Sequence, residues 1–263
     1  MKDSFFTILT EAIQFYIENG FNSQDKLVYW SSLIKESAIK SMLPESIVQR
    51  DMEKSLRQVY KRLVVGKSLI DSNVSRMTID RLKPSLRREL DRRIMVSANL
   101  IKLNRDEAIS TTLRRFQGWA TSIPKGGSKS SDPVEEKKLI RKELSSIRFK
   151  ERRVIIDQTK KLNSSIRDIV AVDSGAIAGI WHSRHSMGYD NRPEHLKRDG
   201  SIFIIRDSWA HKKGYVKPVN GYMDEIEMVG EFVYCSCSYQ YLFHLKQLPE
   251  EYLTEKGKEF IKT

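Results

Sequence analysis

The chain has 263 residues and carries 46 Lys and Arg against 34 Asp and Glu, a formal net charge of +12 at pH 7. Hydrophobic residues make up 40% of the chain, a share that supports a folded core and excludes a largely disordered protein. No apolar run approaches the roughly 20 residues of a membrane helix, and Asp3 and Glu11 lie where a secretion signal needs lysines and then an uninterrupted apolar core. We therefore expect an intracellular protein without membrane contact.

Charge, histidine and cysteine divide the chain into two regions. Residues 1–172 contain 34 basic and 21 acidic residues, a net charge of +13, whereas residues 173–263 contain 12 basic and 13 acidic residues. Both cysteines and all five histidines fall in the second region. The cysteines are one residue apart, a poor geometry for a disulfide, so we expect them to be reduced. This asymmetry predicts a basic helical body over 1–172 and a separate His/Cys-containing module over 173–263.

Apolar residues recur at helical spacing through most of the first region. Ser23 is suited to an N-cap, Pro44 to the first turn of a helix and Gly20 to a C-terminal cap. Pro84 is expected to kink or restart the long helical segment that contains it. The small, polar and basic stretch 122–133 predicts a flexible or phosphate-contacting loop. Helices are expected over 4–20, 23–43, 44–66, 78–119, 133–147 and 149–181.

After Trp181 the pattern changes to short segments with alternating apolar residues. The segments 201–207 and 231–243 are rich in β-branched and aromatic residues and predict strands. The stretch between them contains Gly, Pro and Asn and predicts loops and turns, and a short helix is expected near the C-terminus. The fold class is therefore α+β: a mostly α-helical N-terminal body followed by a small α+β C-terminal module with long loops.

The His and Cys residues of the second region predict a metal site. On a strand over 231–243, the alternation of side chains would place both thiols on the same face. Two thiolates and two imidazoles form a tetrahedral zinc site, which would stabilise a small module with long loops. The spacing matches no standard zinc finger, so the alternative that the cysteines are only small core residues stays open. The expected ligands of a structural Zn²⁺ are His182, His185, Cys235 and Cys237, with His195 as the spare candidate.

The same histidines allow a catalytic alternative. His195, with Glu194 and Asp199 nearby, would then act as a general base beside a metal ion, as in metal-dependent nucleases. The sequence contains no P-loop, no nucleophile elbow and no dinucleotide-binding fingerprint. A protein without catalytic residues is therefore the first expectation, and a metal-dependent nuclease or other DNA-processing enzyme is the alternative.

Basic residues of the first region form a candidate nucleic-acid-binding set. Arginines at helical spacing within 81–93 are able to neutralise phosphates, and lysines lie in the loop 122–133. The alternative is an exposed helix face, on which Glu89 and Asp91 offset part of the charge. The summed charge of +13 favours attraction of a polyanion such as double-stranded DNA, or of an acidic partner surface. The set consists of Arg81, Arg87, Arg88, Arg92, Arg93, Lys125 and Lys129.

Residues 165–243 carry a series of short motifs. The small-residue segment "SGAIAGIW" precedes H-x3-DG, formed by His195, Asp199 and Gly200. A short "IF" strand, a loop with Pro218 and a closing Y-C-x-C follow, and an aromatic segment comes last. This series resembles the C-terminal module of the Mu F-like head morphogenesis family of tailed-phage minor head proteins, and the long helical region before it is also similar to that family.

Two features depart from the family pattern. Ser236 stands where an arginine is usual between the last two cysteines, and His182-x2-His185 stands roughly where the family has a Cys-x2-Cys pair. If zinc holds the family's module together, these histidines are able to replace the missing cysteines, since imidazole and thiolate are both good zinc ligands.

The resemblance implies a structural function. Such proteins are minor virion components that lie in the head interior or at the portal vertex and act in head assembly, DNA packaging or ejection. The implied partners are portal and capsid proteins, with several copies of the chain per head, and possible contact with double-stranded DNA. Besides the nuclease alternative, a host nucleic-acid-binding regulator stays open.

Overall fold

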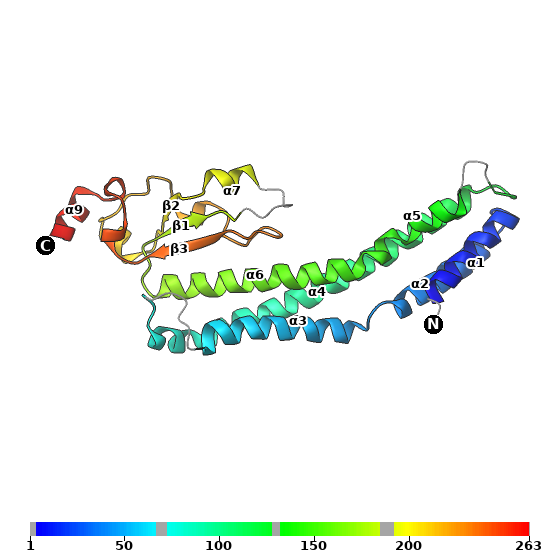
Figure 1. Ribbon diagram of the computed structural model, residues 1–263, viewed down its shortest axis with the longest axis horizontal. Coiled ribbons are helices and arrows are strands. Elements are labelled where there is room, and N and C mark those ends of the chain that lie inside the picture. Colours follow the sequence, from blue (N-terminus) through cyan, green and yellow to red (C-terminus); the bar gives the residue numbers. More distant parts are fainter. Residues whose placement is uncertain (1–3, 67–72, 128–131, 185–191, 263) are drawn as a thin grey trace. The chain divides into compact units, whose positions relative to one another are not determined.

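The computed structural model describes residues 4–66, 73–127, 132–184 and 192–262 (Figure 1). Helices account for most of this part of the chain, and the strands all lie after residue 177, which confirms the expected α+β class. Pro84 lies inside the unbroken helix α4, so the helix does not restart there. The long helices are α1 (Ser4–Asn19), α2 (Gln24–Ser41), α3 (Glu45–Tyr60), α4 (Arg76–Ser122), α5 (Pro133–Ser145) and α6 (Ile147–Asp173).

The chain folds into two compact units whose boundary falls inside α3, α4 and α6. The first unit consists of Met1–Glu53 and Val96–Ile155, and the second of Lys54–Met95 and Ile156–Thr263. Composition predicts a division after residue 172, which does not coincide with these units and stays a prediction.

The first unit is a helical assembly around an apolar core. In α1, Phe5, Leu9, Ile13 and Tyr16 recur every three or four residues and are all buried, as an amphipathic helix requires. The Tyr16 ring packs edge-on against Phe116 of α4, with ring centroids 5.9 Å apart.

One charged pair is buried in this first unit. Arg105 Nε donates to Glu151 Oε1 at 2.5 Å, and Arg105 Nη2 donates to the carbonyl oxygen of Leu43 at 2.9 Å. Both charged side chains are almost fully buried, so each needs these partners to offset the loss of water.

The second unit contains a small antiparallel sheet that lies over the C-terminal part of α6 (Figure 1). The strand order is β2-β1-β3, so β1 is central, with Ala178 opposite both Ile204 and Leu242. Tyr241 Oη donates to Asp168 Oδ1 of α6 at 3.1 Å, a bond that joins the sheet to this helix. The elements of this part are β1 (Ala178–His182), α7 (Pro193–Lys197), β2 (Ile202–Ile204), α8 (Trp209–Lys212), β3 (Ser238–Leu242) and α9 (Glu255–Lys262).

Two expected elements of this unit are corrected by the structure. The helix expected to continue to residue 181 ends at Asp173, because Gly175 adopts a φ of +87°, and the following residues form the central strand β1. The strand expected over 231–243 is shorter, Ser238–Leu242, because Tyr234 adopts a φ of +63° within a turn. The strand expected over 201–207 is present as β2, and the expected C-terminal helix as α9.

In the described part of the chain, every helix is too short or too polar to cross a lipid bilayer.

Candidate metal centre

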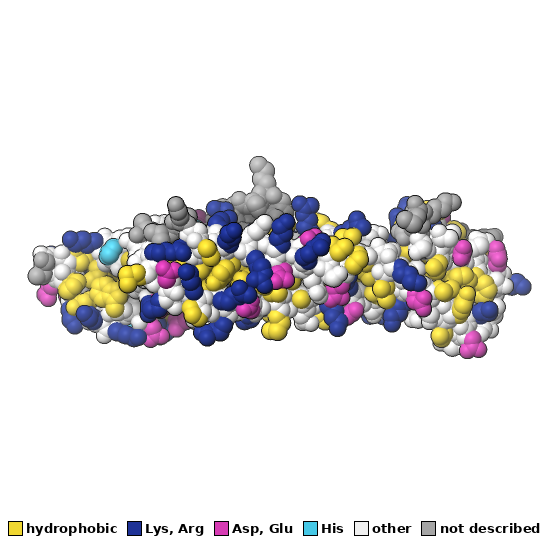
Figure 2. Space-filling view, turned by 90° about the horizontal axis from the view of Figure 1, so that it is seen from below, with side chains coloured by type: hydrophobic (Ala, Val, Ile, Leu, Met, Phe, Trp, Pro, Cys, Tyr) yellow, Lys and Arg dark blue, Asp and Glu magenta, His cyan; other side chains and the backbone are white. Residues whose placement is uncertain are grey.

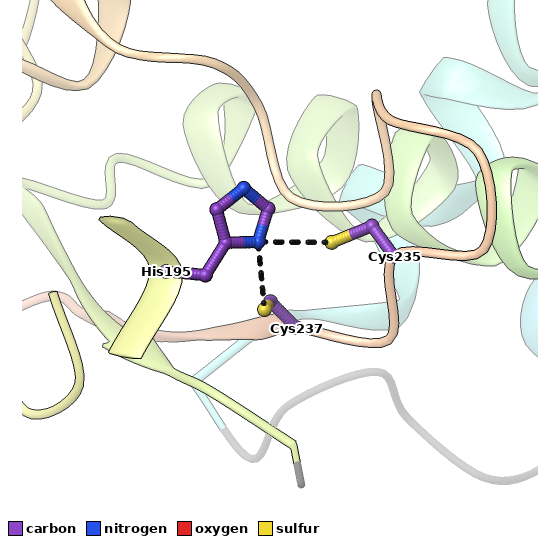
Figure 3. A group of neighbouring side chains, drawn as sticks. All are labelled: His195, Cys235 and Cys237. Carbon is purple, nitrogen blue, oxygen red and sulfur yellow. Dashed lines mark hydrogen bonds between the residues drawn. The ribbon is translucent and has the colours of Figure 1, made fainter. Parts of the chain in front are cut away.

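Three buried side chains of the second unit meet at one point: His195, Cys235 and Cys237 (Figure 3). His195 comes from α7, which begins at Pro193, a residue whose fixed φ suits the first helical position. The cysteines come from the segment that follows the Tyr234 turn and leads into β3. The thiols therefore converge because of a turn, and not because of the strand alternation that the sequence suggested.

The spacing of the three side chains fits a metal ion. His195 Nδ1 lies 3.4 Å from Cys237 Sγ and 3.8 Å from Cys235 Sγ, and the three atoms lie within 4.8 Å of one another. In a tetrahedral zinc site with Zn–S bonds of about 2.3 Å and Zn–N bonds of about 2.0–2.1 Å, sulfur and nitrogen lie about 3.6 Å apart. The residues present therefore match the donor types and the spacing that zinc requires.

Hydrogen bonding within the cluster is incomplete. Both sulfur atoms approach the same imidazole nitrogen, Nδ1, which carries at most one proton. The other nitrogen, Nε2, is buried and has no hydrogen-bond partner among the described residues. A cation among the two sulfur atoms and Nδ1 would satisfy all three donor atoms at once.

Aromatic rings and a cation hold the His195 imidazole in place. The Trp181 ring packs edge-on against it, with centroids 5.2 Å apart, and the Phe232 ring lies 5.7 Å away. The Arg198 guanidinium lies over the Trp181 ring, 5.4 Å from its centroid, and pairs with Glu227. The surrounding rings therefore shield the imidazole from solvent and limit its freedom.

The two thiols perturb one another. A hydrogen bond from Cys237 lowers the pKa of Cys235, whereas the same bond and burial raise the pKa of Cys237. The pair therefore favours one thiolate and one thiol when no metal is bound. Zinc binds the thiolate form of cysteine, so the first of the two anions that it needs is already favoured.

Hydrogen bonds from outside the cluster fix the turn that carries the cysteines. Asp157 of α6 accepts from the backbone N–H of Tyr234 at 2.6 Å and also pairs with Lys161 at 3.2 Å. Arg192 donates to the carbonyl oxygen of Val233 at 3.2 Å. The position of the thiols thus depends on α6 and on the segment just before α7.

The H-x3-DG motif connects the centre to the sheet. Asp199 Oδ1 accepts from the backbone N–H of Ser183 at 2.7 Å, and the N–H of Gly200 donates to the carbonyl oxygen of Trp181 at 2.8 Å. Gly200 adopts a φ of +77°, which explains the glycine at this turn. The motif therefore places His195 next to the end of β1.

The ligand set differs from the one expected from the sequence. His182 lies exposed at the end of β1, with Nε2 3.2 Å from Gln240 Oε1, because the strand directs it away from the cysteines. His185 lies outside the described residues. His195, the spare candidate, lies with the cysteines instead. Its place in the H-x3-DG motif was the sequence feature that pointed to it as a ligand.

Five of the expected nucleic-acid-binding residues lie on one stretch of α4, and each of them interacts with a neighbouring side chain. On α4, Arg87 pairs with Asp91 at 3.1 Å, and Glu89 pairs with both Arg92 and Arg93, at 2.7 and 2.9 Å. Arg81 pairs with Asp173, and Arg88 bonds to Ser85. Lys125 is exposed and belongs to the other unit, and Lys129 lies outside the described residues.

On the face drawn in Figure 2, Lys and Arg side chains are interspersed with Asp, Glu and hydrophobic side chains. On α4, the carboxylates paired with Arg87, Arg92 and Arg93 offset part of the positive charge, as the exposed-face interpretation predicts.

No protein-family model, curated protein or solved structure matches the chain.

Proposed function

We propose that the protein is a structural minor head protein of a tailed bacteriophage that acts near the portal in head assembly, DNA packaging or ejection. The observation that carries the proposal is the convergence of the motifs behind the family resemblance. His195 of H-x3-DG touches both cysteines of Y-C-x-C, and the "IF" strand β2 pairs with β1 beside them. Segments far apart in sequence thus meet in one structural unit, which supports the family resemblance.

In this proposal a structural Zn²⁺ holds the C-terminal module together. His195, Cys235 and Cys237 supply three of its ligands, and His185 stays the predicted fourth. A zinc ion with four protein ligands has no free position for water, so it stabilises the fold without catalysing a reaction. The aromatic rings around His195 suit such a closed site.

The test of the phage function is the composition of the head. Heads purified from a host strain that produces the phage should contain the chain, together with portal and capsid proteins. Deleting residues 1–120 should abolish incorporation, because we propose that the helical body makes most of the contact with the portal or capsid. A chain that is absent from the purified heads, or a truncated chain that is incorporated normally, would contradict the proposal.

A second function is favoured by one observation: the centre has three described ligands, and a cavity lies beside its thiols. Catalytic zinc sites commonly have three protein ligands and one open position. The protein would then be a metal-dependent nuclease. Nicking of supercoiled plasmid that depends on added metal and disappears in His195→Ala would favour the nuclease over the structural protein.

A further inference from the structure

A cavity of about 990 Å³ lies within the second unit, beside the thiols of the metal centre. One wall is formed by α6 between Thr159 and Arg167, and another by residues of 235–241. Arg62, which follows α3, and Arg184, which follows β1, also line the cavity, as do Val59 and Val229. Ligand sites in proteins span about 300–1,000 Å³, so the cavity has room for a nucleotide-sized ligand.

The lining of this cavity is strongly cationic. It includes Arg62, Lys160, Arg167 and Arg184, and none of its described residues is acidic. Within the described part of the chain, the three arginines form no ion pair, and Lys160 donates to Ser236 Oγ at 2.6 Å. Four positive charges around one cavity repel each other, and they focus a positive potential that attracts anions.

Two carboxylates of α6 close in sequence to the lining residues have other partners. Asp168, next to Arg167 on α6, accepts from Tyr241 Oη at 3.1 Å, and burial raises the pKa of Asp168 and so favours its neutral form. Asp157 pairs with Lys161 and accepts from the Tyr234 backbone. Among the described residues, the charge of the cavity lining is therefore not balanced by ion pairs, in contrast to that of the α4 arginines.

We propose that this cavity binds the phosphate groups of a nucleotide-sized ligand. Guanidinium groups donate paired hydrogen bonds to phosphate oxygens, which suits a cavity with three arginines in its lining. Asn163 and Ser164 of α6 add a side-chain amide and a hydroxyl to the same lining. A free nucleoside phosphate and a short single strand of nucleic acid offer the same chemistry. The inference rests on the cavity alone and holds whether or not the chain is a phage protein.

Binding to the full chain tests the proposal. Calorimetry with ADP and with inorganic pyrophosphate, and anisotropy of a short labelled DNA strand, would be measured at low salt. The double substitution Arg62→Gln with Arg167→Gln should weaken binding about tenfold or more, the scale of lost charge-assisted hydrogen bonds. Binding of ADP alone would identify a free nucleotide as the ligand, and binding of the strand alone a nucleic acid; both support the cavity as a phosphate site.

The matched control is Arg87→Gln with Arg92→Gln, which removes the same charge from a helix of the same unit. Because carboxylates already pair with these arginines, the control should weaken binding less than about threefold. Equal losses in both double variants, or no binding of any of the three probes, would overturn the proposal. If circular dichroism shows that the cavity variant does not fold, Lys160→Gln replaces it, with the same expected direction and the same control.

Discussion

Buried polar side chains have different kinds of partners in the two units of the protein. In the first unit, Arg105 and Glu151 pair with each other, and the arginine also bonds to the Leu43 carbonyl. In the second unit, two thiols share one nitrogen of His195, and its other nitrogen has no partner among the described residues. The first unit therefore satisfies its buried charges internally, whereas the second has a centre that an external cation would complete.

The largest effect is expected from the centre of the second unit. His195→Ala removes a proposed zinc ligand and should lower the free energy of unfolding by more than about 4 kcal/mol, the range of a lost metal site. The wild-type protein should also lose stability when a chelator is added. Chemical denaturation with and without chelator measures both effects.

His182→Ala is the control for this substitution. His182 lies exposed, away from the cysteines, so its replacement should change stability by about 0.5 kcal/mol or less. Equal losses for the two histidines, with no response to the chelator, would mean that the cluster is ordinary core packing.

The next largest effect is expected in the first unit. Glu151→Gln leaves the buried Arg105 without its counter-charge and should cost about 3–5 kcal/mol, with no change in the response to chelator. Glu107→Gln is the matched control, since its pair with Arg114 is exposed and should contribute about 0.2–1 kcal/mol. A small cost for Glu151→Gln would mean that the stability of the first unit does not depend on this buried ion pair.

A smaller effect concerns pH. Burial raises the pKa of Asp168 above its ordinary value of about 3.9, and the Tyr241 hydrogen bond opposes this only in part. Because the folded-state pKa is the higher one, the contribution of Asp168 to stability is complete below the ordinary value and is lost as pH rises through the folded value.

Asp168→Asn keeps an acceptor for Tyr241 and cannot ionise. The variant should lose less stability as pH rises from 4 to 7, and it should be the more stable protein at pH 7. Denaturant titrations at several pH values check this prediction. A steeper loss of stability with pH in the variant would mean that Asp168 is charged in the folded protein.

The smallest effect is expected on α4. Arg87→Ala removes an exposed pair with Asp91 and should cost about 0.3–0.5 kcal/mol, with little change in retardation of double-stranded DNA. A large loss of DNA binding in a gel-shift assay would show that the arginines of α4 bind DNA although carboxylates pair with them.

The helices of the chain were predictable because their apolar residues repeat at one spacing. The central strand β1 was not, since "AIAGIW" continues the apolar content of α6, and only Gly175 marks the change. Strand pairing depends on β2 and β3, which lie about 20 and 60 residues further along the chain. Local sequence therefore revealed the edges of the sheet better than its centre.

The cysteines of the candidate centre were predictable from the sequence, but the histidine that joins them was not. Both cysteines were expected as ligands, and the structure places them together, although a turn rather than a strand does so. The choice among the histidines depended on tertiary structure, because among the described histidines only His195 of α7 lies with the thiols. Arg62 and Arg167 of the cavity gave no sequence signal, since they are about a hundred residues apart.

The most direct test of the proposed zinc site is the metal content of the full chain, purified without chelators. We predict about one zinc per chain in the wild-type protein by elemental mass spectrometry, and a large loss of zinc in Cys235→Ser with retention in His182→Ala. Much less than one zinc per wild-type chain, with no uptake when zinc is added, would contradict the proposed zinc site. His195, Cys235 and Cys237 would then be ordinary core residues.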